Sequence, residues 1–343
     1  MLAILGVLVV LVSIFLPYAL DVREKARRVR CSDNLRQIGL ALNSYSDANH
    51  GDWPRVVFDM AHRGYVAFTG PDSQRVLGPG SSVRPNDVTA SLWLLVRQGY
   101  ISREYGSAAA TFICPSSDDV VDPMTDATGR PAAPGQRGNF RSGKNLSYSY
   151  SSLFADIPRM ALGDAKPRGF VAAADKNPGI SHGSDVTGPG ADASPFALRA
   201  GNSRNHGRVG MNVLYANGTV LWQTTPYCGQ SHDNIYTAAA TQPATAPARP
   251  DQRGVCGPQY GPAHAADSYL VPTADQRDAV AFMAPASLPV SRPATAATTL
   301  PATTQAQPPT TATAPATTTA TAPASAPATG PTTMPTTAKF NPG

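Results

Sequence analysis

The sequence predicts an α+β fold in which a long N-terminal helix packs on an antiparallel β-sheet and a disordered tail follows. Three observations lead to this prediction. The first twenty residues carry no charge and continue into a stretch whose apolar residues have helical spacing. An Asn-Gly pair separates two short apolar runs within residues 211–223, which is typical of a β-hairpin. Residues 284–343 consist almost entirely of Ala, Thr, Pro and Ser.

Residues 1–20 have the length and composition of a transmembrane anchor. At about 1.5 Å per residue, a helix of this length spans a hydrocarbon core of about 30 Å. A cleaved signal peptide is the alternative, but it would carry a basic n-region and a small-residue cleavage site. No basic residue precedes Asp21. We therefore expect a single-pass anchor in the lipid bilayer.

Residues 21–47 continue the same helix as an amphipathic extension. Apolar side chains recur three or four residues apart. They are Val22, Ala26 and Val29, then Leu35, Ile38, Leu42 and Tyr45. A stop signal follows at Asn49-His50-Gly51, with Pro54 beyond it. One helix over residues 2–47 is expected, with a bend at Pro17 because proline removes a backbone hydrogen bond.

Residues 48–283 are expected to form one globular domain. The predicted elements are a helix over 88–100 that stops at Gly99, and strands over 111–115, 146–150, 169–175, 212–215, 219–223 and 268–272. Asn217 and Gly218 predict a two-residue type I′ turn, in which both positions have positive φ. An antiparallel sheet follows from this hairpin.

Residues 284–343 are expected to be a disordered tail. They contain one Arg, one Lys, no acidic residue and a single aromatic residue, Phe340. Such a segment buries too little apolar surface to offset the entropy of ordering it. An O-glycosylated spacer and an unmodified linker both fit this composition.

Charge and motifs exclude several function classes. The net charge of +5 comes largely from the segment just after the anchor, without the interleaved aromatic residues of a nucleic-acid-binding face. The sequence has no phosphate-binding loop, no dinucleotide fingerprint, no His-Glu-x-x-His and no Gly-x-Ser-x-Gly. We therefore expect neither nucleic-acid binding nor enzymatic activity.

The four cysteines, Cys31, Cys114, Cys228 and Cys256, show no Cys-x-x-Cys spacing. This argues against local zinc motifs and thioredoxin chemistry. A Cys228–Cys256 disulfide would close a short loop, and a Cys31–Cys114 disulfide would fasten the helix to the sheet. Four reduced thiols are the remaining alternative.

Several segments together resemble one family. They include residues 23–42 after the anchor, the box at 112–116, and the hairpin with its flanks. The motif residues are Cys31, Asn34, Leu35, Cys114, Pro115, His206, Asn212, Asn217, Gly218, Asp233 and Asn234. In these residues the chain resembles type II secretion pseudopilin-like proteins of planctomycete type (DUF1559-like), which have a prepilin-type N-terminal domain and a C-terminal H-X9-DG motif.

Three features depart from the family pattern. The prepilin cleavage site, a Gly before an aromatic-Thr-Leu-Ile-Glu run, is not found. Ten residues rather than nine separate His206 from Asn217. Asn217 itself replaces the motif's Asp. The resemblance nevertheless covers residues 1 to about 237.

The resemblance implies a pilin-like fold and a non-enzymatic subunit of a type II secretion or surface-filament system. Its partners would be other pilin-like subunits or components of the secretion machine. The alternative is an envelope protein that binds a ligand or ion on the same fold. Basic residues after the anchor favour a cytoplasmic domain, whereas the cysteines, the tail and the resemblance favour the periplasmic, extracytoplasmic side, which we expect.

His206 and Asp233 are candidate metal ligands, with His232 beside them. The resemblance implies calcium in a late loop as an alternative, although calcium prefers six to eight oxygen ligands. We expect instead no metal and no other cofactor, with His206 and Asn217 bonded to loop backbone.

Overall fold

The computed structural model describes residues 2–61, 64–68, 83–101, 108–126, 128–163, 165–179, 190–238 and 261–271. The chain divides into two units, Met1–Leu288 and Pro289–Gly343, and every described residue lies in the first unit. The predicted tail over 284–343 and Cys256 lie outside the described residues.

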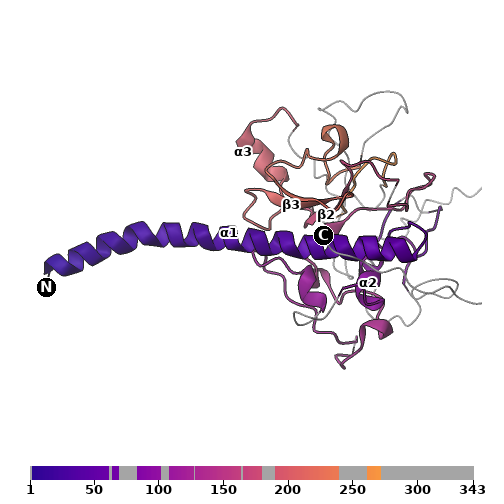
Figure 1. The fold of residues 1–343 in the computed structure, drawn as a ribbon, viewed down its shortest axis with the longest axis horizontal. Helices are drawn as coiled ribbons and strands as arrows, with labels where there is room; N and C mark the ends of the chain where they lie inside the picture. Colours follow the sequence, from indigo (N-terminus) through magenta and orange to yellow (C-terminus); the bar gives the residue numbers. More distant parts are fainter. Residues whose placement is uncertain are drawn as a thin grey trace, which may run out of the picture. The chain divides into compact units, whose positions relative to one another are not determined.

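Helix α1 runs from Leu2 to Ala48 as one continuous helix of 47 residues, about 70 Å at 1.5 Å per residue. Its N-terminal half projects away from the globular part, and its C-terminal half lies across it (Figure 1). The predicted helix over 2–47 is confirmed, and it continues through residue 17 without a break.

The two halves of α1 differ in what their side chains contact. Large apolar side chains are exposed along the N-terminal half, namely Ile4, Val9, Leu11, Val12, Phe15, Leu16, Tyr18, Leu20 and Val22. Apolar side chains are buried along the C-terminal half, namely Cys31, Leu35, Ile38, Ala41, Leu42 and Tyr45. Within the part of the chain that the structure describes, no helix has both the length and the apolar character of a membrane span.

Helix α1 ends at the predicted stop signal. His50 and Gly51 both have positive φ, 57° and 90°. The Gly51 amide donates to the Ser46 carbonyl at 2.9 Å and so caps the last turn. This left-handed exit turns the chain back toward the domain.

The sheet has four antiparallel strands in the order β1-β2-β3-β4. They are β1 (Tyr148–Tyr150), β2 (Val171–Asp175), β3 (Met211–Tyr215) and β4 (Val220–Gln223). Predicted strands over 146–150, 169–175, 212–215 and 219–223 correspond to these four. The predicted α+β fold, a long N-terminal helix with an antiparallel sheet, is confirmed.

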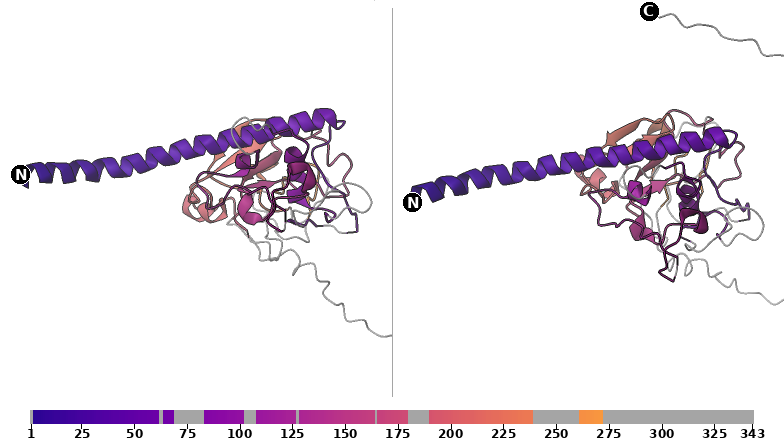
Figure 2. Two further views of the ribbon diagram at one scale, coloured as in Figure 1. Left: turned by 90° about the horizontal axis from the view of Figure 1, so that it is seen from below. Right: turned by 60° about the horizontal axis from the view of Figure 1, so that its bottom comes forward.

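The sheet lies between α1 and a layer of irregular chain. On the α1 side, Gly39 lets the helix approach β3, because a Cβ there would lie 2.9 Å from a methyl group of Leu214. The other face packs against residues of two later segments, Ile235, Tyr236 and Leu270. The views in Figure 2 show α1 running along the globular part at its C-terminal half only.

The remaining helices are short. α2 (Val88–Arg97) is buried along most of its length, and the Asp87 carboxylate caps its N-terminus by accepting from the Ala90 amide at 2.8 Å. α3 spans Pro195–Leu198. The 3₁₀ turns in the described residues are η1 (Ala108–Phe112), η2 (Pro134–Gln136), η3 (Gly143–Asn145), η4 (Arg199–Gly201) and η5 (Gln230–His232). The predicted helix over 88–100 ends three residues earlier, and Gly99 has φ +80° as a stop residue.

The predicted type I′ turn is wrong. Leu214 pairs with Val220, and the Tyr215 amide donates to the Thr219 carbonyl at 2.9 Å, so three residues form the loop. Of these, Gly218 has positive φ, 82°, and Asn217 does not. This is the arrangement of a type I turn followed by a bulge with a left-handed glycine.

Two predicted strands are also wrong. Residues 111–115 belong to η1 and the loop after it, because Phe112 packs against the Phe140 ring at 5.0 Å rather than joining a ladder. Of the predicted strand 268–272, the described residues 268–271 contribute one isolated bridge, between Leu270 and Ser151.

Candidate functional site

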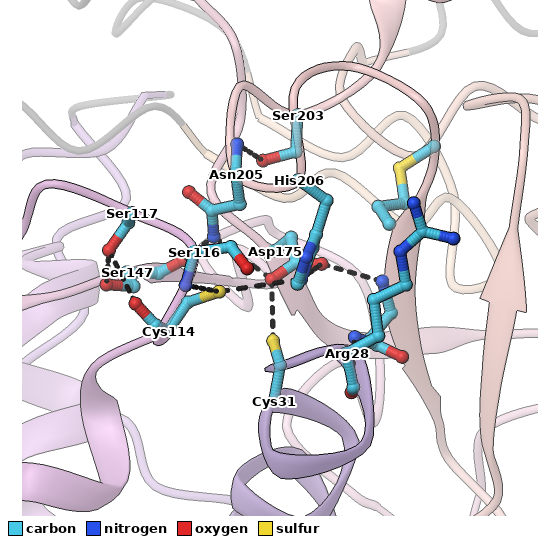
Figure 3. Close-up of polar contacts among 12 residues, drawn as sticks. Arg28, Cys31, Cys114, Ser116, Ser117, Ser147, Asp175, Ser203, Asn205 and His206 are labelled. Carbon is cyan, nitrogen blue, oxygen red and sulfur yellow. Dashed lines mark hydrogen bonds and ion pairs between the residues drawn. The ribbon is translucent and has the colours of Figure 1, made fainter. Parts of the chain in front are cut away.

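Four side chains from four separate segments meet beside the sheet and are called here the buried cluster. They are Cys31 from α1, Cys114 from the loop after η1, Asp175 at the end of β2, and His206 from the loop before β3. Each of the four residues is buried, and their sulfur, oxygen and nitrogen ligand atoms all lie within 4.8 Å of one another. Figure 3 shows Cys31 pointing from the helix toward Asp175, with Cys114 and His206 on the other sides.

The contacts within the buried cluster are short. Cys31 Sγ donates to Asp175 Oδ1 at 3.0 Å. His206 Nε2 lies 3.5 Å from Cys114 Sγ and 3.5 Å from Asp175 Oδ2. The two thiols are free, so the Cys31–Cys114 disulfide considered from the sequence is not formed in this structure.

A carboxylate of α1 holds the other side of the His206 ring. Glu24 Oε1 lies 2.7 Å from His206 Nδ1, and Glu24 Oε2 accepts from the Ser116 hydroxyl at 2.9 Å. His206 also meets the Trp222 ring edge-on at 5.3 Å, and the Arg28 guanidinium stacks on that ring at 4.3 Å. These contacts fix the imidazole plane and direct Nε2 into the buried cluster.

Asp175 is held by neighbours as well. The Asn205 amide donates to its Oδ1 at 3.0 Å, and the Asn212 backbone amide donates to its Oδ2 at 2.7 Å. The Tyr236 hydroxyl donates to its backbone carbonyl at 2.7 Å. Hydrogen bonds within the protein therefore orient both carboxylate oxygens of Asp175.

The sulfur atoms accept hydrogen bonds from outside the buried cluster. The Tyr148 hydroxyl donates to Cys31 Sγ at 3.3 Å, and the Ser116 amide donates to Cys114 Sγ at 3.4 Å. Such donors favour a thiolate over a thiol.

The pKa values follow from burial and these contacts. The hydrogen bond with Cys31, opposed by burial and assisted by His206, lowers the pKa of Cys114 to about 7. Burial alone would lower the pKa of His206, but its contacts with Cys114 and the charge of Asp175 raise it to about 9. Burial raises the pKa of Cys31 and that of Asp175, in the second case against the charge of His206.

Three chemistries use these residue types. Two sulfurs, an imidazole and a carboxylate form a metal-ligand set. Two neighbouring thiols form a redox pair. Cys114, His206 and Glu24 also stand in the order nucleophile, base and orienting carboxylate, but the Cys114 side chain is fully buried, so a substrate has no approach to its sulfur.

The structure places the other predicted motif residues around the buried cluster or apart from it. Asn34 donates to the Ile113 carbonyl at 2.9 Å and to the Tyr148 hydroxyl at 3.2 Å, which joins α1 to two segments of the domain. Leu35 is in the core. Pro115 directly follows Cys114 and is partly exposed. All three residues are therefore close in sequence to one of the two cysteines, Cys31 or Cys114.

The later motif residues have structural contacts. The exposed Asn217 accepts from the Thr219 amide at 3.0 Å within the hairpin loop that Gly218 completes. Asp233 accepts from the Ser268 amide at 3.3 Å, and Asn234 from the Tyr236 amide at 3.1 Å. Asp233 does not belong to the group of ligand atoms around His206.

One expectation is wrong at this site, and one stays a prediction. His206 is bonded to the side chains of Glu24 and Cys114 rather than to loop backbone. The proposed Cys228–Cys256 disulfide involves a residue outside the described part of the chain. Cys228 lies apart from the group of ligand atoms around His206.

Sequence reasoning missed Asp175 and Glu24. Asp175 is the acidic residue that ends the apolar run 170–174, and this position was the available signal. Glu24 stands among five basic residues in 23–30, so nothing in its local pattern sets it apart from a surface ion pair.

The chain matches none of the curated proteins and none of the solved structures. Residues 21–62, which comprise the second half of α1 and the segment after it, match a family model described as a protein of unknown function (DUF1559). In this segment, which contains Glu24, Cys31, Asn34 and Leu35, the chain is therefore similar to DUF1559 proteins.

Proposed function

We propose that the protein is a non-enzymatic, pseudopilin-like subunit of a type II secretion or surface-filament system. The apolar half of α1 anchors it in the lipid bilayer, and its globular part stands on the extracytoplasmic side. Its function is mechanical: apolar helices associate with one another, and the sheet and loops contact other subunits.

The division of α1 into two halves carries this proposal. The C-terminal half is buried against the sheet, with Leu35 and Ile38 both fully covered. Among the described side chains of the N-terminal half, the large apolar ones are exposed; Leu11, Val12 and Phe15 are 48%, 52% and 64% exposed. A single helix with this surface needs lipid or other apolar helices around it.

The charged segment after the anchor fits a membrane-proximal position. Lys25 pairs with Asp21 at 2.8 Å and Arg36 with Asp33 at 3.0 Å along the helix surface. Exposed pairs of this kind contribute little to stability. They supply a polar surface between the apolar half and the domain, where neighbouring subunits would meet.

Membrane extraction tests the anchor. In the double variant Leu11→Arg/Val12→Arg, each arginine at the centre of a span costs on the order of 2.5–3.5 kcal/mol. We expect the wild type to stay in the membrane fraction after alkaline carbonate treatment and the double variant to be released. Leu40→Arg is the matched control, because Leu40 is 62% exposed on the same helix but within the domain.

The side of the membrane is tested by labelling. A cysteine at the exposed position Met60 should react with a membrane-impermeant maleimide in intact cells. Labelling only after cell lysis would place the domain in the cytoplasm and end the secretion or filament proposal.

A second function, an envelope protein that holds an ion on this fold, is favoured by one observation. This is the set of four buried ligand atoms within 4.8 Å of one another. The two functions are compatible. An ion at that position would fasten the C-terminal half of α1 to the domain, whereas the proposed anchor is the N-terminal half.

A further inference from the structure

We propose that the buried cluster binds one zinc ion through four ligand atoms: Cys31 Sγ, Cys114 Sγ, His206 Nε2 and one carboxylate oxygen of Asp175. The site is structural, and it joins α1 to three segments of the globular domain. It does not depend on the proposed membrane function.

The four ligand atoms lie close enough together for a tetrahedral site. Zinc–ligand bonds of about 2.0–2.3 Å place the ligands about 3.3–3.8 Å apart. His206 Nε2 lies within this range, at 3.5 Å, from both Cys114 Sγ and Asp175 Oδ2. Cys31 Sγ lies 3.0 Å from the other carboxylate oxygen, Asp175 Oδ1, which is slightly closer than two ligands of one zinc ion. No two of the four ligand atoms are more than 4.8 Å apart, so small side-chain rotations complete a four-coordinate shell.

The hydrogen bonds that surrounding groups make to the four ligands are typical of zinc sites. A zinc-bound histidine usually places its other ring nitrogen on a carboxylate or carbonyl, which fixes the tautomer and the ring plane. Glu24 provides that carboxylate at 2.7 Å from Nδ1 and is itself held by Ser116. Asn205 and the Asn212 amide orient the Asp175 carboxylate in the same way.

The chemical types of the four ligand atoms indicate which metal the buried cluster would bind. Two thiolates with an imidazole favour zinc over calcium, which takes oxygen ligands. The calcium alternative from the sequence therefore does not suit this cluster. All four residues are buried, so the site has the closed character of structural zinc rather than the open position of catalytic zinc.

The other two chemistries account for fewer of the contacts. A Cys31–Cys114 disulfide would leave His206 Nε2 and Asp175 facing a bond that needs neither of them. A nucleophilic Cys114 would need access from solvent, and its side chain is covered. A zinc ion uses all four residues.

The decisive measurement is the zinc content of the full-length chain, purified in detergent with zinc present. Thiol labelling of the same samples determines whether the cysteines are reduced. We expect about one zinc per chain in the wild type and in the control Cys228→Ser. Zinc should fall below about one fifth of that in Cys31→Ser, Cys114→Ser and Asp175→Asn. Glu24→Gln, which changes only the outer contact, should weaken zinc affinity about 10–100-fold without abolishing binding.

Cobalt provides a readout that needs no variant and so does not depend on how the variants fold. Replacing zinc with Co²⁺ in the wild type should give the sulfur-to-cobalt charge-transfer band and the intense visible bands of a tetrahedral two-thiolate site. Reduced wild-type protein that binds neither metal would overturn the proposal. So would zinc retained in both cysteine variants, or a native Cys31–Cys114 disulfide found by mass spectrometry.

Discussion

Arg137 and Asp122 form a buried ion pair beside α2. The guanidinium donates to both carboxylate oxygens, at 2.6 and 2.9 Å, and both side chains are fully buried. The Arg137 guanidinium also lies 4.7 Å from the centre of the Trp93 ring, whose Nε1 donates to the Arg137 carbonyl at 3.0 Å. The ion pair holds Asp122 and Arg137 together, and Arg137 connects this part of the chain to α2 through Trp93.

Removing one partner of this pair should be costly. Arg137→Met leaves the Asp122 carboxylate buried without its cation, so we expect the free energy of unfolding to fall by about 3–5 kcal/mol. Adding Asp122→Leu should recover much of that loss. Urea unfolding followed by tryptophan fluorescence measures both. The exposed Arg130→Met is the control and should stay within about 0.5 kcal/mol; a similarly small change for Arg137→Met would contradict this account of the pair.

Lys166 gives the molecule a pH dependence at alkaline pH. Burial, and secondly the charge of Arg55, lowers its pKa from 10.5 to about 8, and its ammonium lies 4.4 Å from the centre of the Phe170 ring. Well below pH 8 the lysine is charged in both the folded and the unfolded chain, so the folded state carries the full burial cost. Between about 8 and 10.5 the folded chain binds fewer protons, so stability rises with pH.

The test compares Lys166→Met with wild type across pH. The stability advantage of the variant should be constant well below pH 8 and should shrink by up to about 3 kcal/mol toward pH 10.5. Lys144, whose pKa is raised by its hydrogen bond to Asp118, is an exposed control, and its contribution should weaken slightly as pH rises. A pH-independent difference for Lys166→Met would show that the amine is already neutral or well solvated.

The residues of the buried cluster show what sequence reasoning can and cannot reach. Cys31, Cys114 and His206 stand out by type and by motif. Their meeting point depends on how α1 crosses the sheet, because 144 positions separate Cys31 from Asp175 and 92 separate Cys114 from His206. The absence of Cys-x-x-Cys spacing excludes only local zinc motifs, whereas these ligands come together through the tertiary fold.

At the scale of elements, the packing of α1 on the sheet is the main interaction. Ile38 is fully buried in the core, whereas Leu40, two residues away, is 62% exposed. Ile38→Ala should lower the free energy of unfolding by about 2–5 kcal/mol through lost burial and a cavity. Leu40→Ala, the matched control, should change it by less than about 0.5 kcal/mol. Equal effects in a urea titration would mean that α1 does not pack on the sheet as described.

The elements that could be predicted well are those with a long or strongly marked pattern. α1 has a periodic apolar stripe and a glycine stop, and the β3–β4 hairpin has Asn-Gly between apolar runs. Short apolar runs were ambiguous, because Phe112 and Ile113 fit a 3₁₀ turn as well as a strand. The hairpin loop also has three residues rather than two, since the strand register determines where the turn begins.

At the scale of the whole molecule, α1 joins a half that is buried against the domain and a half with exposed apolar side chains in one continuous helix. Its C-terminal half is fixed to the domain by the apolar core and by the contacts of the buried cluster. Its N-terminal half presents apolar side chains outward. A force on the apolar half would therefore pass directly to the domain, which suits a subunit that assembles through its helix.

The most direct test of this account is site-specific photo-crosslinking in native membranes, with a photoreactive amino acid at Leu16, which is 58% exposed on the apolar half of α1. We predict light-dependent crosslinks to a second copy of the chain or to another helical subunit. The same probe at Phe196, which is 84% exposed on α3, serves as the comparison, and its crosslinked products should differ from those that Leu16 gives through the apolar half of α1. Failure of the Leu16 probe to crosslink to any protein would contradict assembly through the helix.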